Sequence, residues 1–306
     1  AHEFGDEGLR ALEAAGAQLH GQQAARIGIE CGFPQLFRIH LAQALEAADA
    51  PGAFTHAFLA QLVEGGGEFA VVERFESSDD TFALVVPRLV VHASQAARVS
   101  YLGVNLLGPR VWQLAHQQST GERDSHTLLS TVALGGDYAR VRTDARLVGQ
   151  GATTKQIALY YADGTQMHDF RTLQDHVAPR TTSDLLFKGA VQDTARSVYT
   201  GLIRIGHEAK GSVAYQTNRN LLLSDHARAD SLPNLEIEAD DVKCSHGASV
   251  GQLDREHLFY LMSRGLPRSQ AERLVVMGFL GEVLSRLPLG GVVEKVSRII
   301  EERLRG

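Results

Sequence analysis

A cysteine and a histidine two positions apart are the residues of this chain best suited to metal chemistry. They are Cys244 and His246, in the run Asp-Asp-Val-Lys-Cys-Ser-His-Gly-Ala at positions 240–248. If this run is a strand, both side chains project from one face and Ser245 projects from the other. A thiolate beside an imidazole can bind a soft metal or an iron–sulfur species. Two ligands do not complete a tetrahedral site, so the others must come from elsewhere in the chain or from a partner.

The alternative interpretation of the same pair is structural. A single cysteine is most often a small buried hydrophobic residue, and a single histidine is most often a hydrogen-bonding group within the fold. Spacing alone does not separate this interpretation from a ligand pair.

Other enzyme signatures are missing from the sequence. It contains no His-Glu-x-x-His and no Walker A motif. Among the 13 histidines, the strongest cluster is His168-Asp169 with Asp175-His176, which forms no clear metal constellation. Asn218 and Asn220 could line a site, but a turn or an internal side-chain ladder explains them more simply.

Composition narrows the class of protein and of partner. The chain has 306 residues, of which 44% are hydrophobic and 22% are charged, as in an ordinary globular protein. A net charge of -6 argues against a nucleic-acid partner held by a global basic field. Two cysteines far apart do not make a disulfide framework, which favours the reducing cytoplasm. No apolar run approaches the ~20 residues that span a bilayer, so no membrane association is expected.

The pattern of apolar residues divides the chain into three parts. Residues 1–65 are rich in Ala and Leu at helical spacing and predict an N-terminal helical segment. Residues 66–250 contain about a dozen short β-rich runs separated by turn signals, which predicts an all-β body. Strand spacing does not separate a sandwich or jelly roll from a parallel β-helix. Residues 251–306 return to helical spacing and predict a C-terminal helical domain, with Asp254 as one helix cap and a capping box at Ser269–Glu272.

Specific sequence runs follow one another through the middle of the chain. They are Leu-Tyr-Tyr-Ala-Asp-Gly (159–164), Thr-Leu-Gln-Asp-His (172–176), Thr-Thr-Ser-Asp-Leu-Leu-Phe-Lys-Gly (181–189), Tyr-Gln-Thr-Asn-Arg-Asn-Leu-Leu-Leu (215–223), Ala-Asp-Ser-Leu-Pro-Asn-Leu-Glu-Ile (229–237), the Cys-Ser-His run itself and Leu-Phe-Tyr-Leu-Met-Ser-Arg-Gly (258–265). Together they resemble the SufB/SufD family of iron–sulfur cluster assembly proteins. The resemblance extends over about residues 65–285. It is closest to the SufD branch, because the SufB branch carries an additional cysteine that this chain lacks.

The resemblance implies a right-handed parallel β-helix flanked by N-terminal and C-terminal α-helical regions. It further implies a non-enzymatic scaffold in the cytoplasm that acts with SufB and the ATPase SufC. His246 and Cys244 would lie at the SufB interface, with His246 as a ligand shared with SufB. An iron–sulfur cluster would be held there only transiently, with no cofactor bound stably by the chain alone. The C-terminal helices would dock SufC through Leu258, Phe259, Tyr260, Met262, Arg264, Gly265 and Phe279.

Two other functions remain open at this point. One is a metal- or carbohydrate-handling β-helix enzyme, which requires converging acids or a bound metal within the isolated chain. The other is a homodimeric interaction protein, because a parallel β-helix has strand edges that must be paired or covered.

Overall fold

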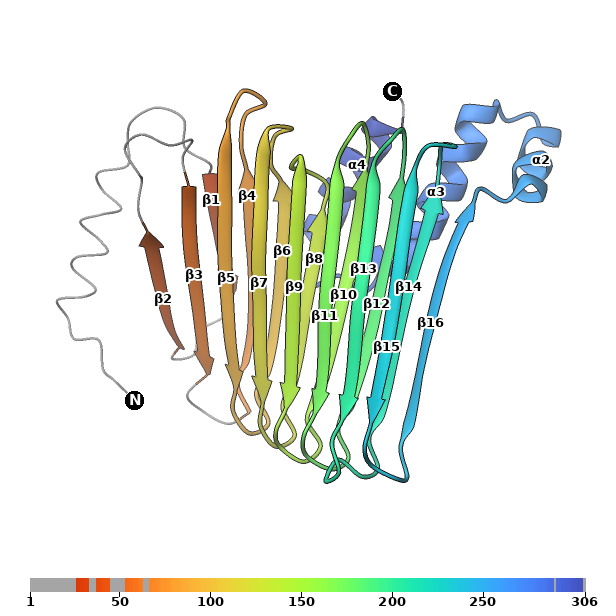
Figure 1. Ribbon diagram of the computed structural model, residues 1–306. Coiled ribbons are helices and arrows are strands. Elements are labelled where there is room, and N and C mark those ends of the chain that lie inside the picture. The colour runs from red at the N-terminus through yellow and green to blue at the C-terminus, as the bar shows by residue number, and fades with distance from the viewer. Residues whose placement is uncertain (1–25, 33–36, 45–52, 63–65, 289, 305–306) are drawn as a thin grey trace.

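The computed structural model describes residues 26–32, 37–44, 53–62, 66–288 and 290–304, the first three ranges and residue 290 by their backbone alone. Two eight-stranded sheets form the body (Figure 1). Sheet A consists of β1 (Arg26–Gly32), β4 (Glu68–Glu76), β6 (Arg98–Leu106), β8 (His126–Ala133), β10 (Thr153–Ala162), β12 (Thr182–Val191), β14 (Val213–Leu222) and β16 (Lys243–Gln252). Sheet B consists of β2 (Phe37–Ala44), β3 (Ala53–Leu62), β5 (Ala83–Ala93), β7 (Val111–Gly121), β9 (Tyr138–Leu147), β11 (Met167–His176), β13 (Arg196–Ile205) and β15 (Arg228–Ile237).

The chain coils between these two sheets. From β3 onward successive strands alternate between sheet B and sheet A, and from β5 onward each pairs in parallel with the strand two places earlier. The pairs β1–β4 and β2–β3 are antiparallel. Glu68, for example, pairs with Arg98, and Thr153 pairs with Thr182. The body is therefore a β-solenoid, which confirms the mostly β fold and excludes the sandwich and the jelly roll.

The faces that look into the solenoid form its lumen. Aromatic side chains from both sheets meet there, with Phe170 lying 4.6 Å from Tyr160 and 5.6 Å from Phe187 between ring centroids. Gly189 makes room for this cluster, because a Cβ at that position would lie 1.8 Å from the Tyr160 ring. The lumen is also polar: the Tyr160 hydroxyl donates to Asn220 Oδ1 over 2.5 Å. The internal side-chain ladder considered for Asn218 and Asn220 is what the structure contains, since Asn218 Nδ2 donates to Tyr160 Oη and Asn220 Nδ2 donates to Asn218 Oδ1.

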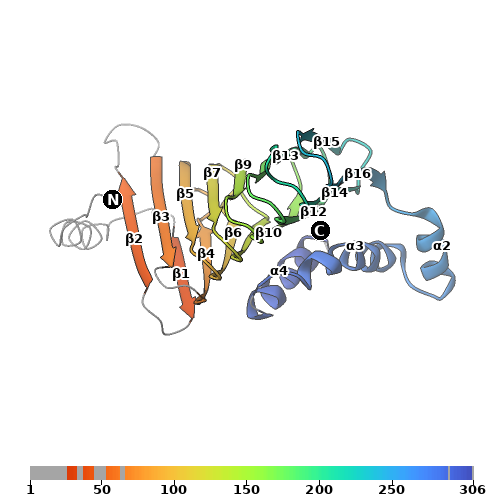
Figure 2. The ribbon, with the colours of Figure 1, turned by 90° about the horizontal axis from the view of Figure 1, so that it is seen from below.

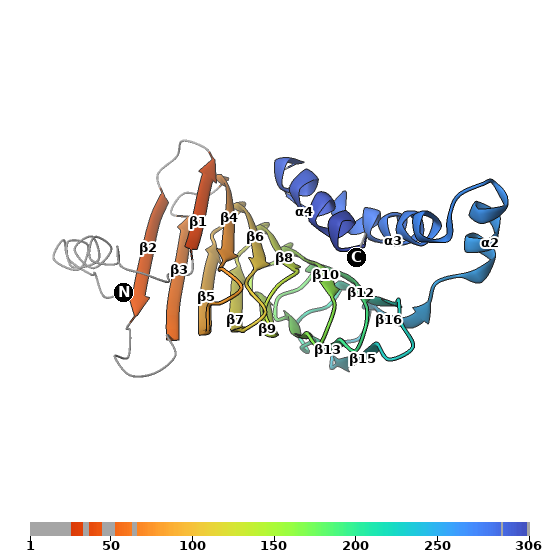
Figure 3. The same ribbon diagram turned by 90° about the horizontal axis from the view of Figure 1, so that it is seen from above.

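Three helices follow the last strand: α2 (Arg255–Ser263), α3 (Arg268–Leu284) and α4 (Gly290–Arg303). Figures 2 and 3 show α3 and α4 lying along the outer face of sheet A, while α2 lies beyond β16. The buried side chains of this contact come from both layers: Leu102, Val132, Ile157, Leu159 and Leu186 from the sheet, and Val276, Leu280, Val283, Val296 and Ile300 from the helices. The middle strands of sheet A, β6, β8, β10 and β12, are therefore buried on both faces, which explains their nearly continuous apolar runs.

One buried lysine ties α3 to the sheet. Lys188 on β12 is 4% exposed, and its ammonium donates to the Phe279 carbonyl over 3.2 Å. It also lies 2.5 Å from Glu282 Oε2 and 4.8 Å from the centre of the Phe279 ring. A buried ammonium needs such partners because desolvation of an unpaired charge is costly.

The outer face of sheet B has no helical cover in the described part of the chain and is polar instead. Arginines lie over partly or fully buried carboxylates: Arg140 and Arg171 contact Asp169, and Arg146 contacts Asp175. His168 and His176 share β11 with these two aspartates but point into the lumen. The sequence cluster is thus split between two faces of one strand and makes no metal site.

The predicted N-terminal helical segment is wrong wherever the structure describes that region. Its described parts are the strands β1, β2 and β3; the rest of residues 1–65 lies outside the described residues. Cys31 is part of β1. Apolar residues such as Phe37 and Leu41 fit helical spacing, but with Ile39 they also fit the alternation of a strand. Pairing of β2 with β3, and of β3 with β5, decides between the two, because local propensity is readily overridden by a sheet ladder.

Of the two predicted helix starts, one is confirmed. Asp254 caps α2, its side chain accepting from the backbone N–H groups of Glu256 and His257. The capping box at Ser269–Glu272 is wrong, because α3 already begins at Arg268 behind Pro267 and has no side-chain cap. Proline sets the backbone for a helix start and needs no hydrogen-bond partner for its nitrogen.

Burial of two lumen histidines predicts how stability depends on pH. Burial lowers the pKa of His168 and of His176 to about 4. In the unfolded chain these histidines have their ordinary pKa of about 6.5, so between pH 6.5 and pH 4 they are protonated there but stay neutral in the folded chain. The free energy of unfolding therefore falls as the pH drops through this range. Each histidine contributes up to about 3 kcal/mol to this loss. Urea unfolding at several pH values measures the free energy of unfolding, which should fall with decreasing pH. His168→Gln should make this dependence on pH less steep. An unchanged dependence in His168→Gln would contradict the contribution of His168.

Candidate functional site

Cys244 and His246 lie on β16, the last strand of the solenoid. They pair in parallel with Ala214 and Gln216 of β14, both of which are buried in the lumen. In-register parallel strands align their pleats, so Cys244 and His246 also face the lumen while Ser245 faces outward with Tyr215. The structure thus brings the two together on one face, as the spacing predicts.

At β16 the solenoid is open. Among the described residues, β16 pairs only with β14, and β15 pairs only with β13. Several lumen-facing side chains of this last rung are consequently exposed, and His246 is one of them. Several are large and apolar: Leu235, Ile237 and Val250 are each between 37% and 45% exposed. The site is an uncovered end of a core rather than a cleft.

The two candidate ligands differ in how freely they can react. Cys244 is half-buried against the small cluster that includes Ile203, Ala214 and Ala239, whereas His246 is exposed. Burial raises the pKa of the Cys244 thiol, so the thiolate that binds metal is scarce at neutral pH. His246 is the more accessible of the pair.

Metal chemistry at this position needs further ligands. Within the described ranges, no group of three or more His, Cys, Asp or Glu side chains could hold a metal ion. A cluster at His246 therefore needs donors from a partner or from residues outside these ranges.

The residues expected to dock SufC separate into two sets. Phe259, Tyr260 and Met262 are 75%, 57% and 43% exposed on α2, and the Arg264 guanidinium lies 5.2 Å from the Tyr260 ring. Gly265 ends this helix in a left-handed conformation with φ of 91°. Leu258 and Phe279 face inward instead: Leu258 is buried, and Phe279 packs beside Lys188. We name the exposed set Phe259, Tyr260 and Met262 the α2 patch.

The roles of two residues in this region, Lys188 and Gln216, could not be predicted from the sequence. Lys188 belongs to a run quoted for the resemblance, yet nothing in the sequence shows that it holds α3. Gln216 pairs with His246, and this juxtaposition appears only when strands about 30 residues apart are brought into register. No helix in the described part of the chain is long and apolar enough to cross a membrane.

Comparison with known proteins identifies the family. Residues 45–279 match the model of the SUF system FeS cluster assembly SufBD core domain. The chain belongs to the SufBD family. It is 36% identical over 261 residues to an iron–sulfur cluster assembly SufBD family protein of Mycobacterium tuberculosis, covering 83% of this chain and 65% of that protein.

Two relatives carry the name SufD. The chain is 32% identical to iron–sulfur cluster assembly protein SufD of Escherichia coli over 241 residues, 79% of this chain and 57% of that protein. It is 38% identical to SufD of Bacillus subtilis over 159 residues, 52% of this chain and 36% of that protein. The chain thus spans less than two thirds of the length of these relatives, and within the SufBD family it is SufD-like.

Burial of Cys244 predicts slow alkylation. In a Cys31→Ser background, Cys244 should react with iodoacetamide several-fold more slowly at neutral pH than a free cysteine, and the rate should still rise above pH ~9, because the raised pKa keeps the thiol protonated. Mass spectrometry of timed samples measures the rate. A reaction that is fast at pH 7 and levels off below pH ~8 would show an activated thiolate instead.

Proposed function

We propose that this chain is a SufD-like scaffold subunit of the SUF machinery, acting with SufB and the SufC ATPase and catalysing no reaction itself. The observation that carries the proposal is the placement of His246. It is an exposed imidazole on the lumen face of the last solenoid strand, at an end that is incomplete within the described residues. A neutral imidazole is a good ligand for iron, and its neighbours leave room for ligands from a second protein.

SufB would cover the open end. Strands β15 and β16 each present a ten-residue edge, and an extended segment of a partner can add to such an edge through main-chain hydrogen bonds. The exposed apolar side chains Leu235, Ile237 and Val250 would be buried by the same contact. An iron–sulfur cluster would form transiently between His246 and SufB ligands, with Cys244 beside it.

SufC would dock on the helices after β16, with the α2 patch as its main contact. Phe259 and Tyr260 are large aromatic side chains exposed next to an arginine, and aromatic and arginine residues dominate the energy of protein interfaces. Because α2 adjoins α3, and α3 is held to β12 by Lys188, force applied by SufC at α2 would reach sheet A through a direct chain of contacts.

Several finer points belong to the same proposal. The solenoid is proposed to be right-handed, because crossovers between parallel strands almost always have that hand. The cytoplasmic location and the lack of a stably bound cofactor remain predictions. A second copy of the chain could occupy the open edges when SufB is missing, which makes a homodimer an outcome to be tested alongside the complex.

Replacing His246 tests the site. In the assembled complex with SufB and SufC, His246→Ala should lower cluster formation on the order of tenfold or more, because a ligand is lost. Visible absorbance and acid-labile sulfide measure the cluster. His226→Ala, which removes another exposed histidine in the turn before β15, is the matched control. Equal cluster yield in His246→Ala and in the control would contradict the proposal that His246 is a cluster ligand.

Polar replacements in the α2 patch test the docking of SufC. Truncation after β16 is unsuitable, because it removes α3 and α4 and exposes the outer face of sheet A. The double variant Phe259→Ser/Tyr260→Ser should instead weaken SufC binding about tenfold or more, as expected for loss of central aromatic contacts. Titration calorimetry measures the affinity, and Phe82→Ser, which replaces an aromatic residue 57% exposed on a turn far from α2, serves as control. Unchanged affinity in the double variant would place SufC elsewhere.

A further inference from the structure

Gln216 is a buried polar side chain whose hydrogen-bonding groups are unused. It is 1% exposed, and neither its amide nitrogen nor its amide oxygen has a hydrogen-bond partner among the residues that the structure describes. Leaving a buried amide unpaired is costly, so such a group in a native protein calls for a specific explanation.

His246 is the neighbour best placed to use that amide. The two residues are direct partners in the β14–β16 ladder, and both point into the lumen. In-register side chains on adjacent parallel strands stack less than 5 Å apart at their bases, the arrangement in which glutamine and asparagine ladders exchange hydrogen bonds along a sheet. His246 has its other side toward the open end, so Gln216 is the only ladder neighbour it has among the described residues.

The Gln216 amide lies against a glycine rather than a polar group. Gly201 on β13 faces it across the lumen, where a Cβ would lie 2.4 Å from Gln216 Nε2 and 2.3 Å from the Tyr199 hydroxyl. That hydroxyl is already engaged with Thr172 Oγ1, at 3.0 Å. The absence of a side chain at position 201 therefore provides room for the amide without supplying a group that would hold it in place.

We propose that Gln216 is the positioning residue for His246: its amide oxygen accepts one N–H of the imidazole, directly or through one water molecule, and directs the unprotonated nitrogen to the open end. Histidines that bind metals characteristically donate their second ring N–H to such an acceptor, which fixes both the tautomer and the orientation of the ring. The assembly role of His246 rests on the function proposed above, but the contact itself does not.

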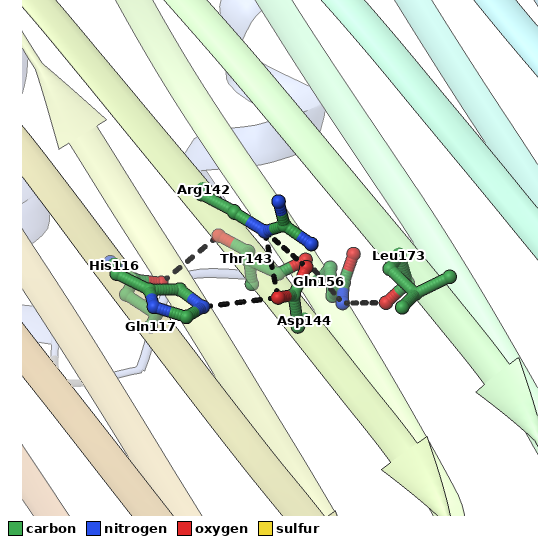
Figure 4. A network of polar contacts seen from close by, with 7 residues as sticks. All are labelled: His116, Gln117, Arg142, Thr143, Asp144, Gln156 and Leu173. Atoms are coloured by element: carbon green, nitrogen blue, oxygen red, sulfur yellow. Dashed lines mark hydrogen bonds and ion pairs between the residues drawn. The ribbon is translucent and has the colours of Figure 1, made fainter.

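The matched control comes from another lumen glutamine. Gln156 on β10 is fully buried and also has an unpaired amide oxygen, while its amide nitrogen lies 3.3 Å from the Leu173 carbonyl (Figure 4). It lies in the same row of sheet A as Gln216, two strands away, and does not neighbour His246. Gln156→Met and Gln216→Met thus make the same chemical change at similar burial.

The experiment is nitrogen NMR of the isolated chain with labelled histidine, at about pH 9, where imidazoles are neutral. The His246 signals are assigned with His246→Asn. In the unaltered chain one tautomer should dominate; in Gln216→Met the minor tautomer should rise about three- to tenfold, the range expected for loss of one hydrogen bond. Gln216→Glu keeps the acceptor and should restore the dominant tautomer, and Gln156→Met should change nothing.

Equal tautomer populations in the unaltered chain and in Gln216→Met would overturn the proposal. If Gln216→Met does not fold, Gln216→Asn, whose shorter amide does not reach the imidazole, is expected to give the same redistribution, and its failure to do so would overturn the proposal equally. This outcome is independent of cluster assembly: His246→Ala tests the proposed function in the complex, whereas the tautomer measurement needs only this chain.

Discussion

Hydrogen bonding between parallel strands is the constraint on which the rest of this structure depends. Each strand of the solenoid satisfies its backbone groups only when it has a neighbour on both sides, and the chain supplies these neighbours by coiling between sheet A and sheet B. Within the described residues, β15 and β16 form the last rung, and each has a neighbouring strand on one side only. An exposed ten-residue edge is a liability for an isolated protein and an advantage for one that works with a partner. That His246 and Cys244 lie on this rung makes the end of the ladder the natural place for a shared site.

The outer faces of sheet A and sheet B differ in polarity and in what covers them. The middle strands of sheet A are apolar outside and rely on α3 and α4 for cover, with Lys188 holding α3 through both the Phe279 carbonyl and Glu282. Sheet B is polar outside, where arginines lie across the carboxylates of Asp144, Asp169 and Asp175. Figure 4 shows one such contact, in which Asp144 bridges His116 and Arg142. The helices are therefore part of the core on one side only, and α2 extends from that side beyond the open end.

The lumen combines two kinds of packing. Aromatic rings fill it around Phe170 and Phe187, while amide and hydroxyl side chains form hydrogen bonds with one another inside it. Polar groups inside a solenoid specify register, because a shift of one residue would move them to the outer face. Among the lumen glutamines, Gln156 and Gln174 use their amide nitrogens as donors, whereas neither the amide nitrogen nor the amide oxygen of Gln216 has a partner among the described residues. Its position next to His246 connects this unpaired amide to the open end of the lumen at β16.

The sequence alone determined a great deal about this protein. Alternation of apolar residues predicted the strands after residue 66, the spacing of Cys244 and His246 predicted a shared face, Asp254 predicted a helix start, and the quoted runs indicated the SufBD family. All of these depend on contacts between residues near one another in the chain or on whole-motif similarity. Only the tertiary structure decided the rest. It made strands of residues in the first segment, divided the predicted docking residues into the exposed α2 patch and the inward-facing Leu258 and Phe279, and paired Gln216 with His246. These outcomes depend on which distant strands come into register, and the free energy of that pairing belongs to the assembled sheet rather than to any local stretch of sequence.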